Sequence, residues 1–284
     1  MAIKITTAQG EPRPPAPVDP LDPRPLIFFD IDNCLYSKDV GIDEMMRDLI
    51  TRYFERLGLP AEEAAHLRHR YYTEYGLAIR GLVRHHQVDP LDYDAQCDAA
   101  LPLETVLKPS AEMQALLKDI DRSRFRVWAL TNAYYNVCCS FLLLSVASDS
   151  PSSSSSPKQH ATRVLSLLDL AEHFEGVVSC DYAAQEFSCK PEEAYFNAAL
   201  AAGGQPDPLQ IYFVDDSALN IKGAHSLKWG HCVLFDEHGD QQEKLGGLEK
   251  LEMGDKEGKV SVVTSMEDLR KAWPEVFVKG SKAI

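Results

Sequence analysis

The sequence has few basic residues and no long apolar segment. Its 29 Lys and Arg residues are outnumbered by 43 Asp and Glu residues, which gives a formal charge of −14. Extended nucleic acid needs clustered basic side chains, so no nucleic acid polymer is expected as a partner. The longest apolar stretch, about 141–147, is far too short to span a bilayer, and no membrane association is expected.

Paired cysteine motifs and a signal peptide are also missing. The seven cysteines are scattered and odd in number, which fits neither a zinc site of close pairs nor a disulfide framework. No charged segment followed by an apolar one opens the chain. We therefore expect a soluble intracellular protein, in the cytoplasm or also in the nucleus. The sequence does not indicate an oligomeric state.

The first third of the chain changes character twice. Residues 1–25 hold seven of the 17 prolines and almost no large apolar side chains, so a flexible Pro-rich leader is expected. Residues 26–29, Leu-Ile-Phe-Phe, form a continuous apolar run typical of a strand buried on both faces. Residues 41–119 have a helical pattern, in which Met45 and Leu49 recur at helical spacing. A helical insertion therefore follows directly after the first strand.

Strand and helix patterns alternate through the rest of the chain. We expect strands at 126–130, 176–180, 209–214 and 230–235, and helices near 160–169, 192–202 and 217–226. Such alternation implies right-handed βαβ units, so the predicted fold is α/β with a doubly wound parallel sheet. The core would comprise residues 26–37 and 109–284, and the helical cap residues 38–108. Ligands of such sheets bind beyond the carboxyl ends of the strands.

The 23 residues at 137–159 match no pattern around them and contain a serine run. Without them, residues 131–136 would lead directly into His160 and a helix whose apolar stripe includes Ala161 and Val164. We interpret the segment as a translated intron, because its codons stay in frame. The alternative is a genuine disordered surface loop, which costs little entropy. Sequencing the cDNA distinguishes the two.

Two polar pairs follow predicted strands. Asp30 and Asp32 leave the first strand together, so that one carboxylate could attack phosphorus while the other gives a proton to the leaving oxygen. Thr131 and Asn132 close the strand at 126–130, where a hydroxyl and an amide can bind phosphate oxygens of a substrate. Taken alone, the acidic pair is more often a solvated turn and the second pair more often a helix cap.

A lysine and two further carboxylates complete the pattern. Lys190-Pro191 opens the helix near 192–202, with the proline at the first helical position and the lysine placed to neutralise a phosphate. Asp215 and Asp216 end a buried strand, and adjacent carboxylates there typically bind a hard divalent cation. The alternatives are a surface lysine and a helix N-cap. All four motifs fall in order on the carboxyl ends of successive predicted strands, which favours a shared site.

Together the four motifs resemble those of haloacid dehalogenase superfamily phosphatases that carry a helical cap. The residues that carry the resemblance are Asp30, Asp32, Thr131, Asn132, Lys190, Pro191, Asp215, Asp216 and Asn220. The stretches 29–36, 71–83 and 131–134 further resemble the pyrimidine 5′-nucleotidase branch, which hydrolyses UMP and CMP. Cys34 departs from the pattern, since many members carry threonine or valine there, and we expect a change in packing more than in chemistry.

The resemblance implies a phosphomonoesterase that acts through an aspartyl-phosphate intermediate. Asp30 would attack phosphorus, and Asp32 would protonate the leaving oxygen and then activate the hydrolytic water. Thr131 and Lys190 would hold the transferring group. The expected partner is a small phosphomonoester.

Mg²⁺ is the cofactor that the resemblance implies. Asp215 would bind it together with Asp30 and the main-chain carbonyl of Asp32, while Asp216 would support the metal through its outer coordination shell. Asn220 would orient the acidic pair. Such a local positive charge also explains how an acidic protein could bind a phosphorylated substrate.

Substrate choice would depend on the cap. Tyr72, Tyr75, Arg80 and His85 could stack on a pyrimidine or pair with its carbonyl groups, and the alternative is ordinary helix packing. The same chemistry would serve a sugar phosphate, phosphoglycolate or lysophosphatidate. A 2-haloacid dehalogenase is disfavoured, because attack on carbon needs neither a leaving-group acid nor magnesium. A non-catalytic binding scaffold would be expected to have lost one of these charged groups.

Overall fold

The computed structural model of the chain describes residues 4–7, 22–134, 160–182, 187–205, 207–246, 259–278 and 280. Its centre is a seven-stranded sheet in the order β1-β4-β3-β2-β5-β6-β7, with every neighbouring pair parallel. The strands are β1 (Lys4–Thr7), β2 (Leu26–Phe29), β3 (Arg126–Tyr134), β4 (Gly176–Cys180), β5 (Ile211–Asp215), β6 (His231–Phe235) and β7 (Lys259–Val263). The predicted doubly wound α/β fold is confirmed.

Helices cover both faces of the sheet, because alternate side chains of each central strand enter separate apolar cores. Ile27 and Phe29 of β2 face the core that contains Leu116 and Leu165. Phe28 faces the opposite core, in which Phe196 and Ile221 lie. The first core is covered by α6 (Ala111–Lys118), α7 (His160–Leu167) and α10 (Leu269–Ala272), and the second by α8 (Glu193–Gly203) and α9 (Ala218–Ser226).

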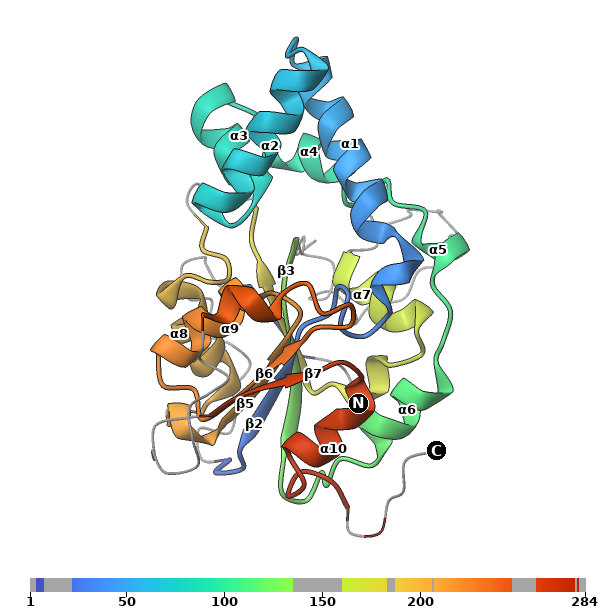
Figure 1. Cartoon of the computed structure of the whole chain (residues 1–284), viewed down its shortest axis with the longest axis vertical. Helices are drawn as coiled ribbons and strands as arrows, with labels where there is room; N and C mark the ends of the chain where they lie inside the picture. The colour runs from blue at the N-terminus through green and yellow to red at the C-terminus, as the bar shows by residue number, and fades with distance from the viewer. Residues whose placement is uncertain are drawn as a thin grey trace, which may run out of the picture.

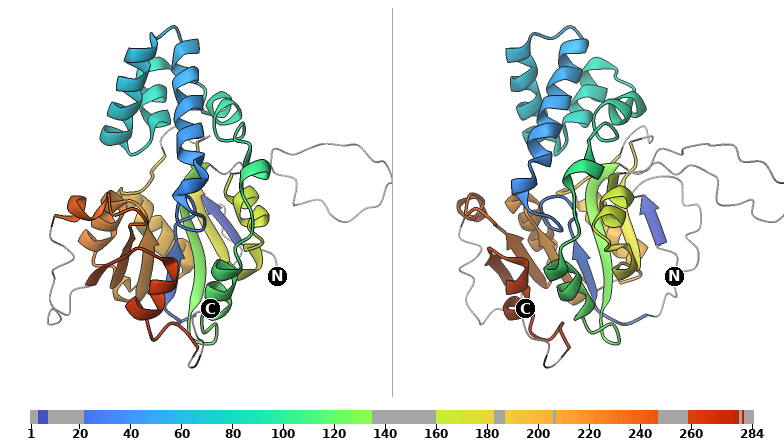
Figure 2. Two further views of the ribbon diagram at one scale, coloured as in Figure 1. Left: turned by 45° about the vertical axis from the view of Figure 1, so that its right-hand side comes forward. Right: turned by 90° about the vertical axis from the view of Figure 1, so that its right-hand side faces the viewer.

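The insertion after β2 is helical and lies beyond the carboxyl ends of the strands (Figures 1 and 2). It contains α1 (Ile42–Arg56), α2 (Ala61–Tyr75), α3 (Ala78–His86) and α4 (Pro90–Gln96), followed by α5 (Leu103–Val106) on the way back to the sheet. Gly76 ends α2 in the left-handed region that glycine favours, and Asp89 caps α4 through the N–H of Leu91. These signals divide the insertion into short helices that pack on one another.

Short 3₁₀ helices occupy several connections. They are η1 (Lys38–Val40), η3 (Ala171–His173), η4 (Pro208–Gln210), η5 (Gln242–Leu245) and η7 (Met266–Asp268). No helix in the described ranges is long and apolar enough to cross a membrane.

The structure corrects two expectations about strands. Lys4–Thr7, within the predicted leader, form the edge strand β1, whereas residues 1–3 and 8–21 lie outside the described residues. The edge of β4 that β3 leaves open offers main-chain groups for this pairing. Strand β3 also continues past Thr131 to Tyr134. The interpretation of residues 137–159 as an intron or loop concerns residues that the structure does not describe.

Candidate active site

Segments far apart in the sequence meet at the carboxyl end of the sheet. Asp30 directly follows β2, and its N–H donates to the carbonyl of Val214 at 2.9 Å. Asp215 is the last residue of the neighbouring β5. Lys190 reaches the same point from the connection between β4 and α8. The parallel pairing of β2 with β5 therefore places Asp30 beside Asp215, and the connection after β4 brings Lys190 to both.

Lys190 joins two of the predicted carboxylates. Its Nζ donates to Asp30 Oδ1 at 2.6 Å, to Asp215 Oδ2 at 2.7 Å and to the carbonyl of Leu130 at 2.8 Å. The side chain is only 1% exposed. Burial lowers the pKa of Lys190, but the two carboxylates raise it further, so the ammonium stays charged well above its ordinary range. All three of its hydrogens are used, which fixes the position of its charge.

Asn132 holds the main chain around Lys190. Its Oδ1 accepts the Lys190 N–H at 2.7 Å, and its Nδ2 donates to the Lys190 carbonyl at 3.1 Å. The amide expected to bind phosphate is thus engaged with protein, and its contact with substrate stays a prediction. Pro191 is not the first helical residue, because α8 begins at Glu193 after an N-cap at Glu192. The Glu192 carboxylate accepts the N–H of Cys189 at 3.2 Å, which closes the turn before the helix.

The adjacent acids Asp215 and Asp216 have neighbours opposite to those expected. Asp215 Oδ1 accepts the Ser217 N–H and Asn220 Nδ2, both at 2.9 Å. Its Oδ2 accepts Lys190 and, at 3.2 Å, Asn220 again. With both oxygens engaged by donors, Asp215 is poorly placed to be the main metal ligand. Asn220 does orient this acid, as predicted from its position in the motif.

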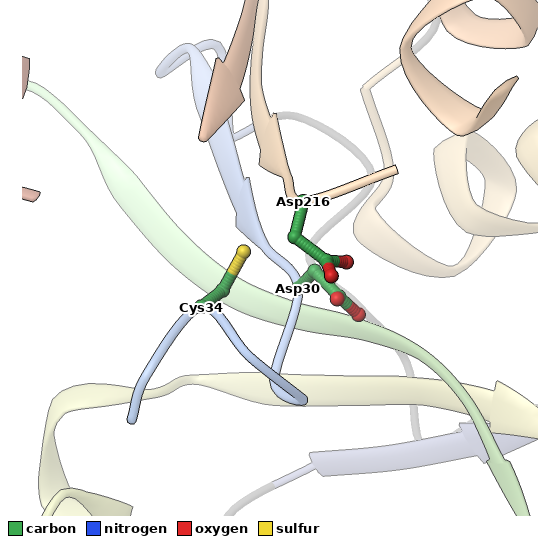
Figure 3. Close-up of side chains that lie close together, drawn as sticks. All are labelled: Asp30, Cys34 and Asp216. Carbon is green, nitrogen blue, oxygen red and sulfur yellow. The ribbon is translucent and has the colours of Figure 1, made fainter. Parts of the chain in front are cut away.

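Asp216 is the acid that faces Asp30 (Figure 3). One carboxylate oxygen of each, together with Cys34 Sγ, lie within 4.8 Å of one another. Asn33 supports this arrangement by donating to Asp216 Oδ2 at 3.3 Å. Its positive φ of 57° turns the chain after β2, a conformation that asparagine tolerates better than most residues.

The charges of this group are unbalanced. Burial raises the pKa of Asp30 well above its ordinary value, and the neighbouring carboxylates add to this rise although Lys190 opposes it. Burial and the charge of Asp215 raise the pKa of Asp216 to about 7. A hard divalent cation would relieve this repulsion, and two carboxylate oxygens are the donors Mg²⁺ prefers. Burial raises the pKa of the Cys34 thiol, so it stays neutral and is a poor ligand for such a cation.

Asp32 has a different set of partners. Tyr36 Oη donates to its Oδ1 at 2.8 Å, and His160 Nε2 lies 2.7 Å from the same oxygen. Burial raises the pKa of Asp32, but the charge and hydrogen bond of His160 outweigh it, and the pKa is lowered. Burial lowers the pKa of His160, whereas Asp32 raises it by a larger amount.

His160 was not among the predicted site residues. The signal was a polar residue at the start of an otherwise apolar helix after the strand that carries Thr131. Its separation of 128 positions from Asp32 hid the pairing. Thr131 itself is buried, and its Oγ1 accepts the Ala133 N–H at 3.0 Å. Its hydroxyl hydrogen has no acceptor within the described residues and is free for a ligand.

Of the four predicted cap residues, Tyr72 on α2 is the one whose pKa is affected by the carboxylates at the end of the sheet. Its side chain is half exposed, yet burial of its phenol and the nearby Asp216 and Asp215 raise its pKa to about 12. Tyr75 and His85 are instead joined to each other, with Oη and Nε2 2.9 Å apart.

Arg80 connects the cap with the core. Its Nη1 donates to Glu192 Oε1 at 2.6 Å and to the carbonyl of Tyr75 at 2.8 Å. The guanidinium also lies over the Phe187 ring, 5.8 Å from its centroid. Its predicted contact with substrate therefore competes with these partners and stays a prediction.

Comparisons with known proteins agree with this architecture. A family model described as haloacid dehalogenase-like hydrolase matches residues 25–228. Phosphate metabolism protein 8 of Saccharomyces cerevisiae is 31% identical over 242 residues, which cover 82% of this chain and 68% of the yeast protein.

Solved structures share the fold at low identity. A hydrolase from Pseudomonas syringae aligns with a TM-score of 0.53 at 17% identity, covering 90% of this chain and 100% of that one. CbbY from Rhodobacter sphaeroides, in complex with xylulose-(1,5)-bisphosphate, aligns with a TM-score of 0.52 at 15% identity, covering 85% of this chain and 94% of that one.

Proposed function

This chain belongs to the haloacid dehalogenase-like hydrolase family, and on that premise we propose that it is a Mg²⁺-dependent phosphomonoesterase whose nucleophile is Asp30. The observation that carries the proposal is the buried Lys190 ammonium, which binds Asp30 and Asp215 while the Asp216 carboxylate lies beside Asp30. A lysine paired in this way holds one oxygen of Asp30 still, and the other oxygen can attack phosphorus.

The residues have separate tasks in the reaction. Asp30 forms a bond to phosphorus as the bond to the leaving oxygen breaks, and Asp32 gives that oxygen a proton. A water molecule then attacks the aspartyl-phosphate, returns a proton to Asp32 and releases inorganic phosphate and the Asp30 carboxylate. Thr131 donates its free hydroxyl hydrogen to a phosphoryl oxygen, and Lys190 offsets the negative charge next to it.

Asp30, Asp216 and the main-chain carbonyl of Asp32 would hold Mg²⁺. When bound, the ion supplies positive charge against the phosphoryl oxygens. Asp215 instead fixes Lys190, because both of its oxygens already accept hydrogen bonds.

The substrates we propose are pyrimidine nucleoside 5′-monophosphates such as UMP and CMP. Two features support this choice: the resemblance of residues 29–36 and 71–83 to the pyrimidine 5′-nucleotidase branch, and the half-exposed Tyr72 near the catalytic charges. An aromatic face at this position suits a flat base. Sugar phosphates, phosphoglycolate and lysophosphatidate are the competing substrates.

A panel of these phosphomonoesters, assayed with Mg²⁺ and with EDTA, tests the proposal. We expect hydrolysis that requires Mg²⁺, is highest for UMP or CMP, and is lost in Asp30→Asn. The matched control is Asp22→Asn, an acid that pairs with Arg24 away from the site and should leave activity intact. Equal rates on all esters would remove the nucleotidase assignment, and full activity of Asp30→Asn would remove the phosphatase mechanism.

A further inference from the structure

Asp32 is held through one of its two oxygens. Tyr36 Oη and His160 Nε2 both contact Oδ1, at 2.8 and 2.7 Å. An unprotonated carboxylate oxygen only accepts, so the imidazole carries a proton on Nε2 in this contact. Within the described ranges Oδ2 accepts no hydrogen bond, and the Asp32 side chain is 34% exposed, compared with 8% for Asp30. Oδ2 is therefore the oxygen open to a ligand.

His160 is itself fixed in place. Its side chain is 3% exposed, and it begins α7. Arg163, one turn later, donates to the carbonyls of Ala99 at 3.2 Å and Leu101 at 2.9 Å, and pairs with Glu104 at 2.8 Å. These bonds join α7 to the segment that returns from the cap to the sheet. The imidazole therefore approaches Asp32 from α7, which is held in place separately from the segment after β2 that carries the aspartate.

We infer that His160 is a positioning residue, whose hydrogen bond together with that of Tyr36 turns Asp32 so that Oδ2 faces the leaving oxygen. The inference rests on the proposed function, because it assigns the task of His160 through the acid role of Asp32. When the negatively charged phosphoryl group is bound beside Asp32, it favours the protonated carboxyl and opposes the effect of His160. As Asp30 bonds to phosphorus and the ester bond breaks, this proton moves from Oδ2 to the leaving oxygen. The attacking water later returns a proton to Oδ2. His160 keeps its own proton in both steps.

A positioning role and a purely structural role predict different substrate dependence. An alkoxide leaving group, as in a nucleoside monophosphate, needs a proton from Asp32, whereas p-nitrophenolate leaves without one. The value of kcat/KM includes only the steps up to departure of the alcohol, so the later role of Asp32 with water does not enter it. A misplaced acid should lower kcat/KM for the alkyl ester alone, whereas a damaged fold should lower it for both esters.

The experiment compares kcat/KM for UMP and for p-nitrophenyl phosphate in the full-length protein with Mg²⁺. We expect His160→Leu to lower the UMP value by about 10- to 100-fold through kcat, while KM and the p-nitrophenyl value change little. His160→Gln keeps a donor near Nε2 and should recover most of the loss. Asp32→Asn should show the same split at larger size. His173→Leu, before the amino end of β4, is the matched control and should show no split.

The outcomes distinguish a failure of the proposed function from a failure of the inference about His160. If the unmodified protein hydrolyses neither ester with Mg²⁺, the proposed function fails. If it hydrolyses both and Asp32→Asn shows the split, but His160→Leu lowers both esters equally, the inference about His160 is overturned and the phosphatase stands. Should His160→Leu not fold, as judged by circular dichroism, His160→Ala, which also lacks the donor, and Tyr36→Phe decide. Absence of any split in both would overturn the inference.

Discussion

The carboxyl end of the sheet and the helical insertion above it hold their polar side chains in different ways. At the sheet, Lys190 is tied to Asp30 and Asp215, residues 160 and 25 positions away, and is almost fully buried. In the insertion, Tyr75 pairs with His85 only ten positions away, on exposed helix surface. The geometry around Asp30 is therefore fixed by buried contacts between distant segments, whereas this pair in the insertion depends on an exposed contact between neighbouring helices.

The largest predicted difference in stability lies between removal of the buried Lys190 charge and removal of the partly exposed Arg80 charge. Lys190→Met leaves two buried carboxylates uncompensated, and we expect activity to be lost and the free energy of unfolding to fall by about 3–5 kcal/mol. Arg80→Met breaks the pair with Glu192, whose side chains are 24% and 38% exposed, and should cost about 0–1 kcal/mol. Urea unfolding in EDTA measures both. Equal losses would contradict the contrast between the regions.

The next contrast divides Asp215 from Asp216. At pH 8, Asp216→Asn removes a buried charge beside the like charge of Asp215, so the melting temperature measured in EDTA should rise. In the activity assay, which contains no EDTA, the Mg²⁺ concentration for half-maximal activity should increase at least about tenfold. Asp215→Asn removes a partner of Lys190 and should lower the melting temperature. If instead Asp215→Asn raises the Mg²⁺ concentration for half-maximal activity and Asp216→Asn does not, Asp215 is the main metal ligand, as the motif predicted.

A smaller effect is expected in the insertion. Tyr72→Ala should lower kcat/KM for UMP about tenfold, because loss of base stacking costs roughly 1–3 kcal/mol per base, and should change p-nitrophenyl phosphate less. Tyr72→Phe keeps the ring and should behave like the unmodified protein. Tyr75→Ala is the matched control, since that ring is joined to His85. A uniform loss on both esters in Tyr72→Ala would remove its assignment to the base.

A further effect concerns the pH dependence of stability at Asp98, at the end of the insertion. Burial raises the pKa of its carboxyl from 3.8 to about 7, against the opposing effect of His160. The folded state therefore keeps a proton that the unfolded chain has lost, so this contribution is complete below about pH 4 and is lost as pH rises to about 7. Asp98→Asn should flatten the fall in melting temperature between about pH 4 and pH 7. An unchanged slope would contradict the burial assigned to Asp98.

The sheet was largely predictable because its signals are local and strong. The apolar run of β2 and the acids after it mark a buried strand and its exit in a few residues. β1 was missed because Lys4–Thr7 lie in a Pro-rich stretch, and their pairing depends on the free edge of β4. β7, Lys-Val-Ser-Val-Val, was missed because its short run gave little signal.

The site was predictable in membership but not in pairing. The motifs identified Asp30 directly after β2, Lys190 in the connection before α8, and Asn220 in the first turn of α9. Which of the two adjacent acids would face Lys190 depends on the direction in which β5 ends, and spacing does not specify it. The contact between His160 and Asp32 depends on how α7 docks against the returning insertion, a tertiary arrangement that no local pattern encodes.

The most direct test of the central claim is to trap the phosphorylated residue. Asp32→Asn can still release p-nitrophenolate but activates water poorly, so with Mg²⁺ and p-nitrophenyl phosphate it should give a stoichiometric burst of p-nitrophenolate and retain one phosphoryl group. Mass spectrometry after acid quenching should place that group on Asp30. Phosphoryl transfer to another residue, or turnover with no covalent adduct in rapidly quenched samples, would contradict the account.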